Sequence, residues 1–348
     1  MVNFTILAGG YTSFVVSYLF NSDASTLTVL NQSPTGANPS WISLHPTNKS
    51  ILYATNEDEP GALQSFTIGS QGVLDLIDTV PSGGDAPAFT TALNNGQVAI
   101  MNYNTGNGKI IPTTSDPLHF TTDAPLITFP SVNQSHPHMA LQHDSEVFIP
   151  DLGADKVWRL VEDGAPGNWK IQGFIQQPTG SGPRHIATRG DTLYVLHELS
   201  STLTQQLIPA PPNGTTPLIA NASILPPTFP AGSDFHAAEL LLTEPTASFP
   251  QPLAYASNRN TGNVDPRGDT IAIFALEPQL TLLTQVYTGL DQVRGMRLFG
   301  PENEFLIAAG VAGSAGTKVF KRVNGGQDLE LVVTNTDITQ RSSFVWLD

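Results

Sequence analysis

The 348-residue chain contains no cysteine. Disulfide bonds, thiolate metal sites and a cysteine nucleophile are therefore excluded. Basic residues are scarce as well: 15 Lys and Arg stand against 30 Asp and Glu, which gives a formal net charge of −15. Proteins that bind nucleic acid normally carry a basic patch, so we expect neither nucleic acid nor an anionic membrane as a partner. An anionic small molecule would have to be held by a few local arginines.

Charged residues make up only 13% of the chain, against about 25% in an average globular domain. The sequence also lacks an apolar run long enough to span a bilayer and a convincing amphipathic helical stretch. Thr, Ser, Asn, Gly and Pro fill the difference, with 30 Gly and 28 Pro. These residues favour turns, so the composition predicts many short strands.

The N-terminus shows no basic segment followed by an apolar core, so no signal peptide is visible and we expect a cytoplasmic protein. The alternative is a secreted protein whose leader is absent from this chain. Sequons of the type Asn-x-Ser/Thr are consistent with that alternative; they begin at Asn3, Asn31, Asn48, Asn133, Asn213 and Asn221.

A proline-centred turn followed by an apolar strand recurs along the chain. Its prolines, Pro39, Pro87, Pro137 and Pro183, are separated by 48, 50 and 46 residues, and looser versions follow at 234–237 and 292–296. Each turn is followed by a second short apolar strand that usually ends in polar residues. A period near 50 with several strands per unit is typical of the four-stranded blades of a β-propeller.

The sequence therefore predicts an all-β fold, a single seven-bladed β-propeller spanning residues 1–348. Six repeats are visible, and the leftover segments 4–8 and 329–333 would form the seventh blade, so that strands from both termini close the ring. A β-sandwich would not explain the sustained period. The proline-rich segment 204–232 is predicted to be a long loop between blades.

Ionisable and polar residues recur at these turns and strand ends, where we expect the mouth of the central channel. The candidates are His136, His138, Arg184, His185, Glu198, Asp234, His236, Asn258 and Arg259. Each has a structural explanation on its own: a histidine that caps a turn, an arginine that ties two blades, a solvated carboxylate. Their recurrence in successive repeats is the argument for a shared site.

Several of these segments resemble the signature segments of the seven-bladed lactonase family, which includes propeller-type 6-phosphogluconolactonase and fungal 3-carboxy-cis,cis-muconate lactonizing enzyme (carboxymuconate cyclase). The resemblance covers essentially the whole chain. The segments that carry it are 136–139, 151–157, 180–185, 193–199 and 256–259. The chain departs from the family in a longer segment at 260–268 and in the absence of polar residues at 308–313.

The resemblance implies a lactonase or muconate-lactonizing cycloisomerase that acts on a small lactone or dicarboxylate without a cofactor. It places the catalytic groups on His136 or His138 and on Glu198, and substrate binding on Arg184 and Arg259. We add His185, His236 and Asn258 to the expected binding residues from their positions in the repeat.

These residue types suit the chemistry. Arginines can clamp carboxylates bidentately or stabilise an oxyanion, and a glutamate or histidine can transfer the proton. Neither hydrolysis nor lactonization needs a metal; we expect none, although His136 and His138 are the pair that could ligate one. The sequence leaves open a non-catalytic binding or scaffold propeller and a different enzyme on the same scaffold. It does not separate hydrolysis from isomerisation or fix the oligomeric state.

Overall fold

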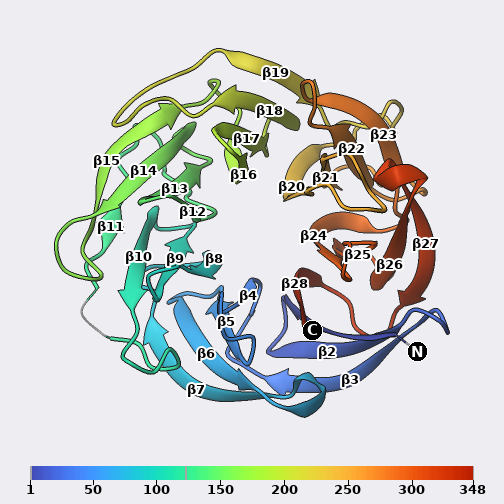
Figure 1. Cartoon of the computed structure of the whole chain (residues 1–348), viewed down its shortest axis with the longest axis horizontal. Coiled ribbons are helices and arrows are strands. Elements are labelled where there is room, and N and C mark those ends of the chain that lie inside the picture. The colour runs from blue at the N-terminus through green and yellow to red at the C-terminus, as the bar shows by residue number, and fades with distance from the viewer. Residues whose placement is uncertain (1, 122–123, 348) are drawn as a thin grey trace.

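The computed structural model describes residues 2–121 and 124–347. It contains seven four-stranded antiparallel sheets arranged as the blades of a ring (Figure 1). The predicted seven-bladed β-propeller is thus confirmed. None of the helices in the described part of the chain is long and apolar enough to cross a membrane.

The first four blades are numbered in chain order, and each is given from its inner to its outer strand. Blade 1 comprises β4 (Ile42–Leu44), β5 (Ile51–Asn56), β6 (Ala62–Ile68) and β7 (Leu74–Pro81). Blade 2 comprises β8 (Pro87–Ala92), β9 (Gln97–Asn102), β10 (Asn107–Pro112) and β11 (Ile127–Thr128). Blade 3 comprises β12 (Leu141–His143), β13 (Glu146–Asp151), β14 (Lys156–Glu162) and β15 (Trp169–Gln176). Blade 4 comprises β16 (Pro183–Arg189), β17 (Thr192–His197), β18 (Thr202–Leu207) and β19 (Leu218–Ser223).

The remaining blades follow the same order. Blade 5 comprises β20 (Phe235–Leu242), β21 (Leu253–Asn260), β22 (Thr270–Ala275) and β23 (Thr281–Tyr287). Blade 6 comprises β24 (Asp291–Phe299), β25 (Phe305–Ala312), β26 (Thr317–Val323) and β27 (Asp328–Asn335). Blade 7 comprises β28 (Arg341–Leu347), β1 (Asn3–Gly10), β2 (Phe14–Asn21) and β3 (Thr26–Pro34). Two single-turn 3₁₀ segments, η1 (Ser70–Gly72) and η2 (Asn324–Gly326), complete the elements.

Burial explains why the second strand of each blade carries the clearest sequence signal. Every residue of β5, β9 and β21 is buried, because neighbouring blades cover both faces of these strands. The outer strands β19 and β23 are mostly exposed or half-buried. The core lies between blades, as in the aromatic cluster of blades 6 and 7, where the rings of Phe20 and Phe305 lie 5.0 Å apart. The apolar runs that predict the repeat are therefore the surfaces that hold adjacent blades together.

Blade 7 combines the two ends of the chain. The last strand, β28, pairs with β1, so that Ala8 lies opposite Phe344. The segment 329–333, expected to fill this place, belongs instead to β27, the outer strand of blade 6. Both segments are short and apolar, and the sequence pattern does not distinguish the outer strand of one blade from the inner strand of the next.

The segment 204–232 differs from the expected inter-blade loop. It contains the end of β18 and all of β19, the outer strand of blade 4. Residues 208–217 connect these two strands and pair with blade 3, where Gly214 donates a backbone hydrogen bond to Phe174. Only 224–234 links blade 4 to blade 5. Because β19 is largely solvent-exposed, it lacks the apolar pattern by which a strand is recognised.

A repeated β-bulge positions side chains at the start of the inner strands. In blades 2, 4, 6 and 7 the residues skipped in the strand register are Ala88, Arg184, Arg294 and Ser342. Two positions before each, the backbone has positive φ, at Ala86, Gly182, Gln292 and Gln340. A bulge re-aims the side chain it carries. Here it directs one side chain per blade toward the channel axis.

Candidate active site

The bulge residues meet on the axis of the propeller. Together with Ser40, Trp41, Glu57 and His138, they line a small cavity of about 10 Å³, to which six of the seven blades contribute. We call it the axial cavity. A space of about this size holds a single water molecule.

The mouth is built from the ends of the second strands. In an antiparallel blade these ends lie beside the starts of the inner strands. In blade 4, His197 of β17 lies opposite Pro183 of β16. In blade 5, Asn258 of β21 lies opposite Ala237 of β20 in the same way. In blades 2, 4 and 5 the residues that follow this position are Tyr103, Glu198 and Arg259. We define the arginine mouth as Tyr11, Glu57, Tyr103, Arg184, Glu198, Arg259 and Arg294, whose charges act on one another.

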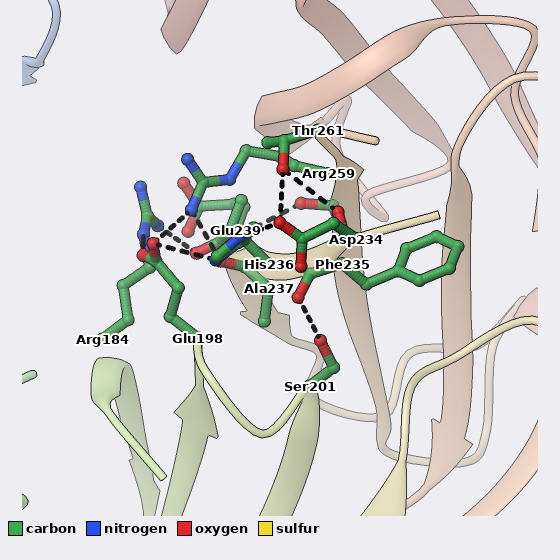
Figure 2. Close-up of polar contacts among 12 residues, drawn as sticks. Arg184, Glu198, Ser201, Asp234, Phe235, His236, Ala237, Glu239, Arg259 and Thr261 are labelled. Atoms are coloured by element: carbon green, nitrogen blue, oxygen red, sulfur yellow. Dashed lines mark hydrogen bonds and ion pairs between the residues drawn. The ribbon is translucent and has the colours of Figure 1, made fainter. Parts of the chain in front are cut away.

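Glu198 lies between two arginines (Figure 2). Its Oε2 forms an ion pair with Arg184 Nε at 2.9 Å, and its Oε1 forms one with Arg259 Nη2, also at 2.9 Å. Burial by itself would raise the pKa of Glu198, but the charges of Arg259 and Arg184 outweigh it and the pKa is lowered. Glu198 is therefore a carboxylate at neutral pH and does not supply a proton.

The two paired arginines are also bound to the backbone of blade 5. Arg184 donates a hydrogen bond to Ala238 O, and Arg259 Nη2 donates one to Ala237 O at 3.2 Å. Burial, followed by repulsion from Arg259, lowers the pKa of Arg184 to about 9. Both guanidinium groups stay charged at neutral pH, and both help to hold blades 4 and 5 together.

Arg294 differs from the other two arginines. It is half-buried, and among the residues that the structure describes its guanidinium has no hydrogen bond or ion pair. Its nearest aromatic contact is the ring of Tyr11, 5.4 Å from the guanidinium carbon. Burial would lower the pKa of Arg294, but Tyr11 and Glu57 outweigh it and the pKa is raised. Arg294 is thus a charged group whose donors remain available.

Sequence reasoning did not select Arg294 as a site residue. The signal was present, because the segment 292–296 is one of the looser turn repeats and Arg294 occupies the bulge position of Arg184. With Arg294 included, three arginines face Glu57 and Glu198 across the mouth. This leaves one surplus positive charge in a chain whose net charge is −15.

The two histidines of the 136–138 turn have different environments. Nδ1 of His136 lies 2.8 Å from the carbonyl oxygen of Tyr103, so this nitrogen carries the hydrogen and donates it. Nε2 then has a free lone pair, with no hydrogen-bonding partner in the described residues. The ring stacks on Tyr103 with centroids 4.4 Å apart, and Tyr103 in turn feels the charge of Glu198. His136 therefore has the tautomer of a general base beside the arginine mouth.

His138 is buried on the wall of the axial cavity. Burial, followed by the charge of Arg184, holds its pKa well below the usual range. Its Nδ1 has no partner in the part of the chain described. An imidazole whose pKa is held this low is a weak base, and His138 is also buried, so of the two histidines His136 is the better catalytic candidate.

The other predicted residues separate into two groups. His236 lies at the rim of the mouth, with Nδ1 3.8 Å from Glu198 and Nε2 3.3 Å from Asp234 (Figure 2). His185 points away from the mouth and pairs with Glu239 at 2.8 Å. Asn258 is buried and donates a hydrogen bond to Ile224 O at 2.6 Å. The structure thus brings His236 together with the arginines and leaves His185 and Asn258 outside the mouth.

Within residues 2–121 and 124–347, no group of three or more His, Asp or Glu side chains is placed to hold a metal ion. The arrangement at the mouth offers one free cation, one free imidazole nitrogen and a fixed Arg–Glu–Arg network. Such groups can bind an anionic substrate, activate water and stabilise an oxyanion.

Comparisons with known proteins agree with this fold. The periplasmic gluconolactonase of Pseudomonas aeruginosa superposes with a TM-score of 0.86 at 20% identity, covering 100% of this chain and 99% of that one. A “putative 6-phosphogluconolactonase” from Bacteroides fragilis gives a TM-score of 0.83 at 20% identity, covering 99% and 98%. An uncharacterized protein of Staphylococcus aureus strain USA300 is 24% identical over 295 residues, 79% of this chain and 80% of its own length.

At these identities the likeness to solved structures establishes the fold alone. The family assignment rests on a sequence model described as "Lactonase, 7-bladed beta-propeller", which matches residues 5–346. That match covers nearly the whole chain and includes every residue of the arginine mouth. The chain therefore belongs to the family of seven-bladed β-propeller lactonases.

Proposed function

We propose that the chain is a lactonase that hydrolyses a small lactone bearing a single carboxylate, and that it does so at the arginine mouth. Membership of the family supports a lactone-processing enzyme. The names given to the Pseudomonas aeruginosa and Bacteroides fragilis proteins, a gluconolactonase and a "putative 6-phosphogluconolactonase", favour hydrolysis over lactonization of a muconate. The observation that carries the proposal is the free guanidinium of Arg294 beside the fixed Arg184–Glu198–Arg259 network.

Arg294 would bind the carboxylate of the substrate. A guanidinium offers two parallel donors to a carboxylate, so it sets orientation as well as affinity. The other two arginines are poorly suited to this role because each already shares Glu198 and a backbone carbonyl. Anchoring one end of the substrate at Arg294 would hold the lactone carbonyl over the mouth.

His136 would act as the general base. Its Nε2 would take a proton from a water molecule as the water oxygen attacks the lactone carbonyl carbon. Arg259, whose Nη1 makes no hydrogen bond within the described residues, would stabilise the oxyanion that forms. Collapse of the intermediate breaks the ring C–O bond, and the imidazolium of His136 returns the proton to the departing alkoxide. One water is consumed and a hydroxy acid is released.

Glu198 would keep the two arginines in place. A carboxylate whose pKa is lowered by Arg259 and Arg184 is a weak base and cannot be a general acid at neutral pH. His236 is less suited than His136 to activate water, because both of its ring nitrogens face carboxylates. In this proposal Glu198 contributes by positioning and by charge, and the proton is transferred by His136.

The charge balance of the mouth also bears on the substrate. A phosphate dianion calls for several free donors or a nest of backbone amides, whereas a single carboxylate is matched by one guanidinium. Arg294 is the arginine of the mouth whose whole guanidinium lacks a hydrogen bond or ion pair in the described residues, so we propose a carboxylate-bearing lactone in preference to a phosphorylated one. Lactones of aldaric acids, which carry a free carboxylate, represent this class.

The test is a substrate panel followed by pH-stat titration and ultraviolet absorbance. It would include an aldarolactone, a neutral aldonolactone, 6-phosphogluconolactone and a muconolactone. We expect acid release to be fastest with the aldarolactone. A change in diene absorbance without net uptake of water would indicate a cycloisomerase instead. Binding of lactones without turnover of any of them would contradict the proposal and favour a binding propeller.

A further inference from the structure

A larger cavity lies on the other side of the axial cavity. Its volume is about 410 Å³, and its walls include Trp41, Phe89, His185, Glu239, Arg297 and Trp346. We call it the aromatic chamber. The inner strands start at the arginine mouth and run toward it: Arg297 follows Arg294 by three positions in β24, and Trp346 stands near the end of β28. The chamber therefore belongs to the opposite end of the channel.

Aromatic rings separate the chamber from the arginine mouth. The ring of Trp41 lies 4.6 Å from that of Phe89 and 5.3 Å from that of His185. His185 in turn lies 5.2 Å from His138, which faces the axial cavity. Trp41 lines both the chamber and the axial cavity, and neither Arg294 nor His136 is among the lining residues of the chamber.

The chamber wall carries a cation, Arg297, on which the charge of Glu239 acts. The side chain of Arg297 is exposed to the space of the chamber, and within the described ranges its guanidinium makes no hydrogen bond or ion pair. Glu239, the acidic residue of the wall, is already bound by His185 Nδ1 at 2.8 Å and by the backbone amide of Leu240 at 3.0 Å. Lys49 adds a second positive charge at the rim. Two positive charges, Arg297 and Lys49, thus stand against the one negative charge of Glu239 on the chamber wall.

His185 adds a second unsatisfied group. It is 1% exposed, and its Nε2 has no hydrogen-bonding partner among the residues described. Nδ1 faces the carboxylate of Glu239 and donates to it, so Nε2 is a buried acceptor without a partner. Buried polar atoms are nearly always hydrogen-bonded in native proteins. The guanidinium of Arg297 is exposed and lies on the wall of a cavity that is also lined by Trp41, Phe89 and Trp346, which is an arrangement suited to a ligand with both a charged and an aromatic part.

We propose that the aromatic chamber is a second binding site, for a small aromatic carboxylate whose carboxylate pairs with Arg297 and whose rings pack against Trp41, Phe89 and Trp346. An apolar cavity of about 150 Å³ holds one benzene ring, so a chamber of about 410 Å³ has room for a fused two-ring body. A carboxylate supplies the bidentate partner that a guanidinium prefers. The site is independent of lactone turnover at the arginine mouth.

Isothermal titration calorimetry with 2-naphthoate tests the site. We expect the unaltered protein to bind the probe with one-to-one stoichiometry. Arg297→Gln should weaken binding about tenfold or more, because it removes a charged hydrogen-bonding partner. Lys321→Gln removes an exposed positive charge elsewhere and should leave binding unchanged. The neutral analogue 2-naphthalenemethanol should bind more weakly than naphthoate and be insensitive to Arg297→Gln.

A second variant guards against misfolding of the first. Thr91 lies on the chamber wall, and Thr91→Trp should fill the space and abolish binding of both probes while the far-ultraviolet spectrum stays that of the unaltered chain. The proposal is overturned if naphthoate does not bind at millimolar concentration. It is also overturned if binding survives both Arg297→Gln and Thr91→Trp, or if Arg294→Gln is the change that abolishes it.

Discussion

Replacing Arg294 with glutamine separates a binding role from a structural one. Arg294 makes no hydrogen bond or ion pair in the described residues, so the change breaks no polar contact of the fold. Its charge also lowers the pKa values of Arg184 and Arg259. Removing it relieves this repulsion but also removes the attraction between Arg294 and Glu57 and Glu198, so the two effects oppose one another. We expect the free energy of unfolding of Arg294→Gln to lie within about 1 kcal/mol of the unaltered value.

The activity of Arg294→Gln, unlike its stability, should fall. If Arg294 binds the substrate carboxylate, its loss removes a charge-assisted hydrogen-bonded pair, which contributes about 1.5–3 kcal/mol. This corresponds to a decrease of roughly 10- to 150-fold in kcat/KM. The decrease should appear mainly in KM for a carboxylate-bearing lactone and should be small for a neutral lactone. A stable variant with impaired activity is the pattern expected of a functional residue.

Arg184→Gln is the matched control. Arg184 is 1% exposed, pairs with Glu198 and donates to Ala238 O. Its loss should destabilise the fold by about 3 kcal/mol or more, because Glu198 and the carbonyl lose a buried partner. Urea unfolding and initial-rate kinetics on both variants make the comparison. An Arg294→Gln variant that loses more than about 1 kcal/mol of stability yet keeps full activity would refute the assignment.

Three further predictions concern the same mouth. Glu198→Gln should lower the free energy of unfolding by about 2–4 kcal/mol at pH 7, since it leaves two buried arginines unpaired. The pKa of Glu198 is lowered in the folded state. The carboxylate therefore stabilises the fold above its unfolded pKa near 4.5, and this stabilisation is lost as the pH falls through the folded pKa. Urea titrations of the unaltered protein and of Glu198→Gln should therefore give free energies of unfolding that converge toward low pH. His136→Asn keeps a hydrogen-bond donor for Tyr103 O but removes the base, and it should lower kcat by roughly 10²–10⁴-fold. The control, His138→Asn, should lower kcat far less. Equal losses of kcat in the two variants would contradict the assignment of His136 as the base. Finally, 6-phosphogluconolactone should be turned over poorly compared with an aldarolactone in a pH-stat assay, and efficient turnover of the phosphorylated compound would refute the carboxylate preference.

The sequence by itself determined the architecture. The interval between proline turns and the apolar second strands predict a seven-bladed propeller, because strands enclosed between two neighbouring blades are buried on both faces and are apolar over most of their length. Strands without an apolar pattern of their own were missed or misassigned. The outer strand β19 is exposed and has no clear pattern, and β28 was confused with β27 because both are short and apolar.

The sequence also identified Arg184, Glu198 and Arg259, whose positions in the repeat place them at one end of the channel. Only the tertiary structure decided which neighbouring side chains share that site. The bulge at Arg184 turns this residue to the mouth, while the next residue, His185, faces the opposite chamber. The same bulge brings Arg294 to the axis. Side-chain direction in a strand follows from register, and a bulge shifts register without changing the apolar pattern that a sequence displays.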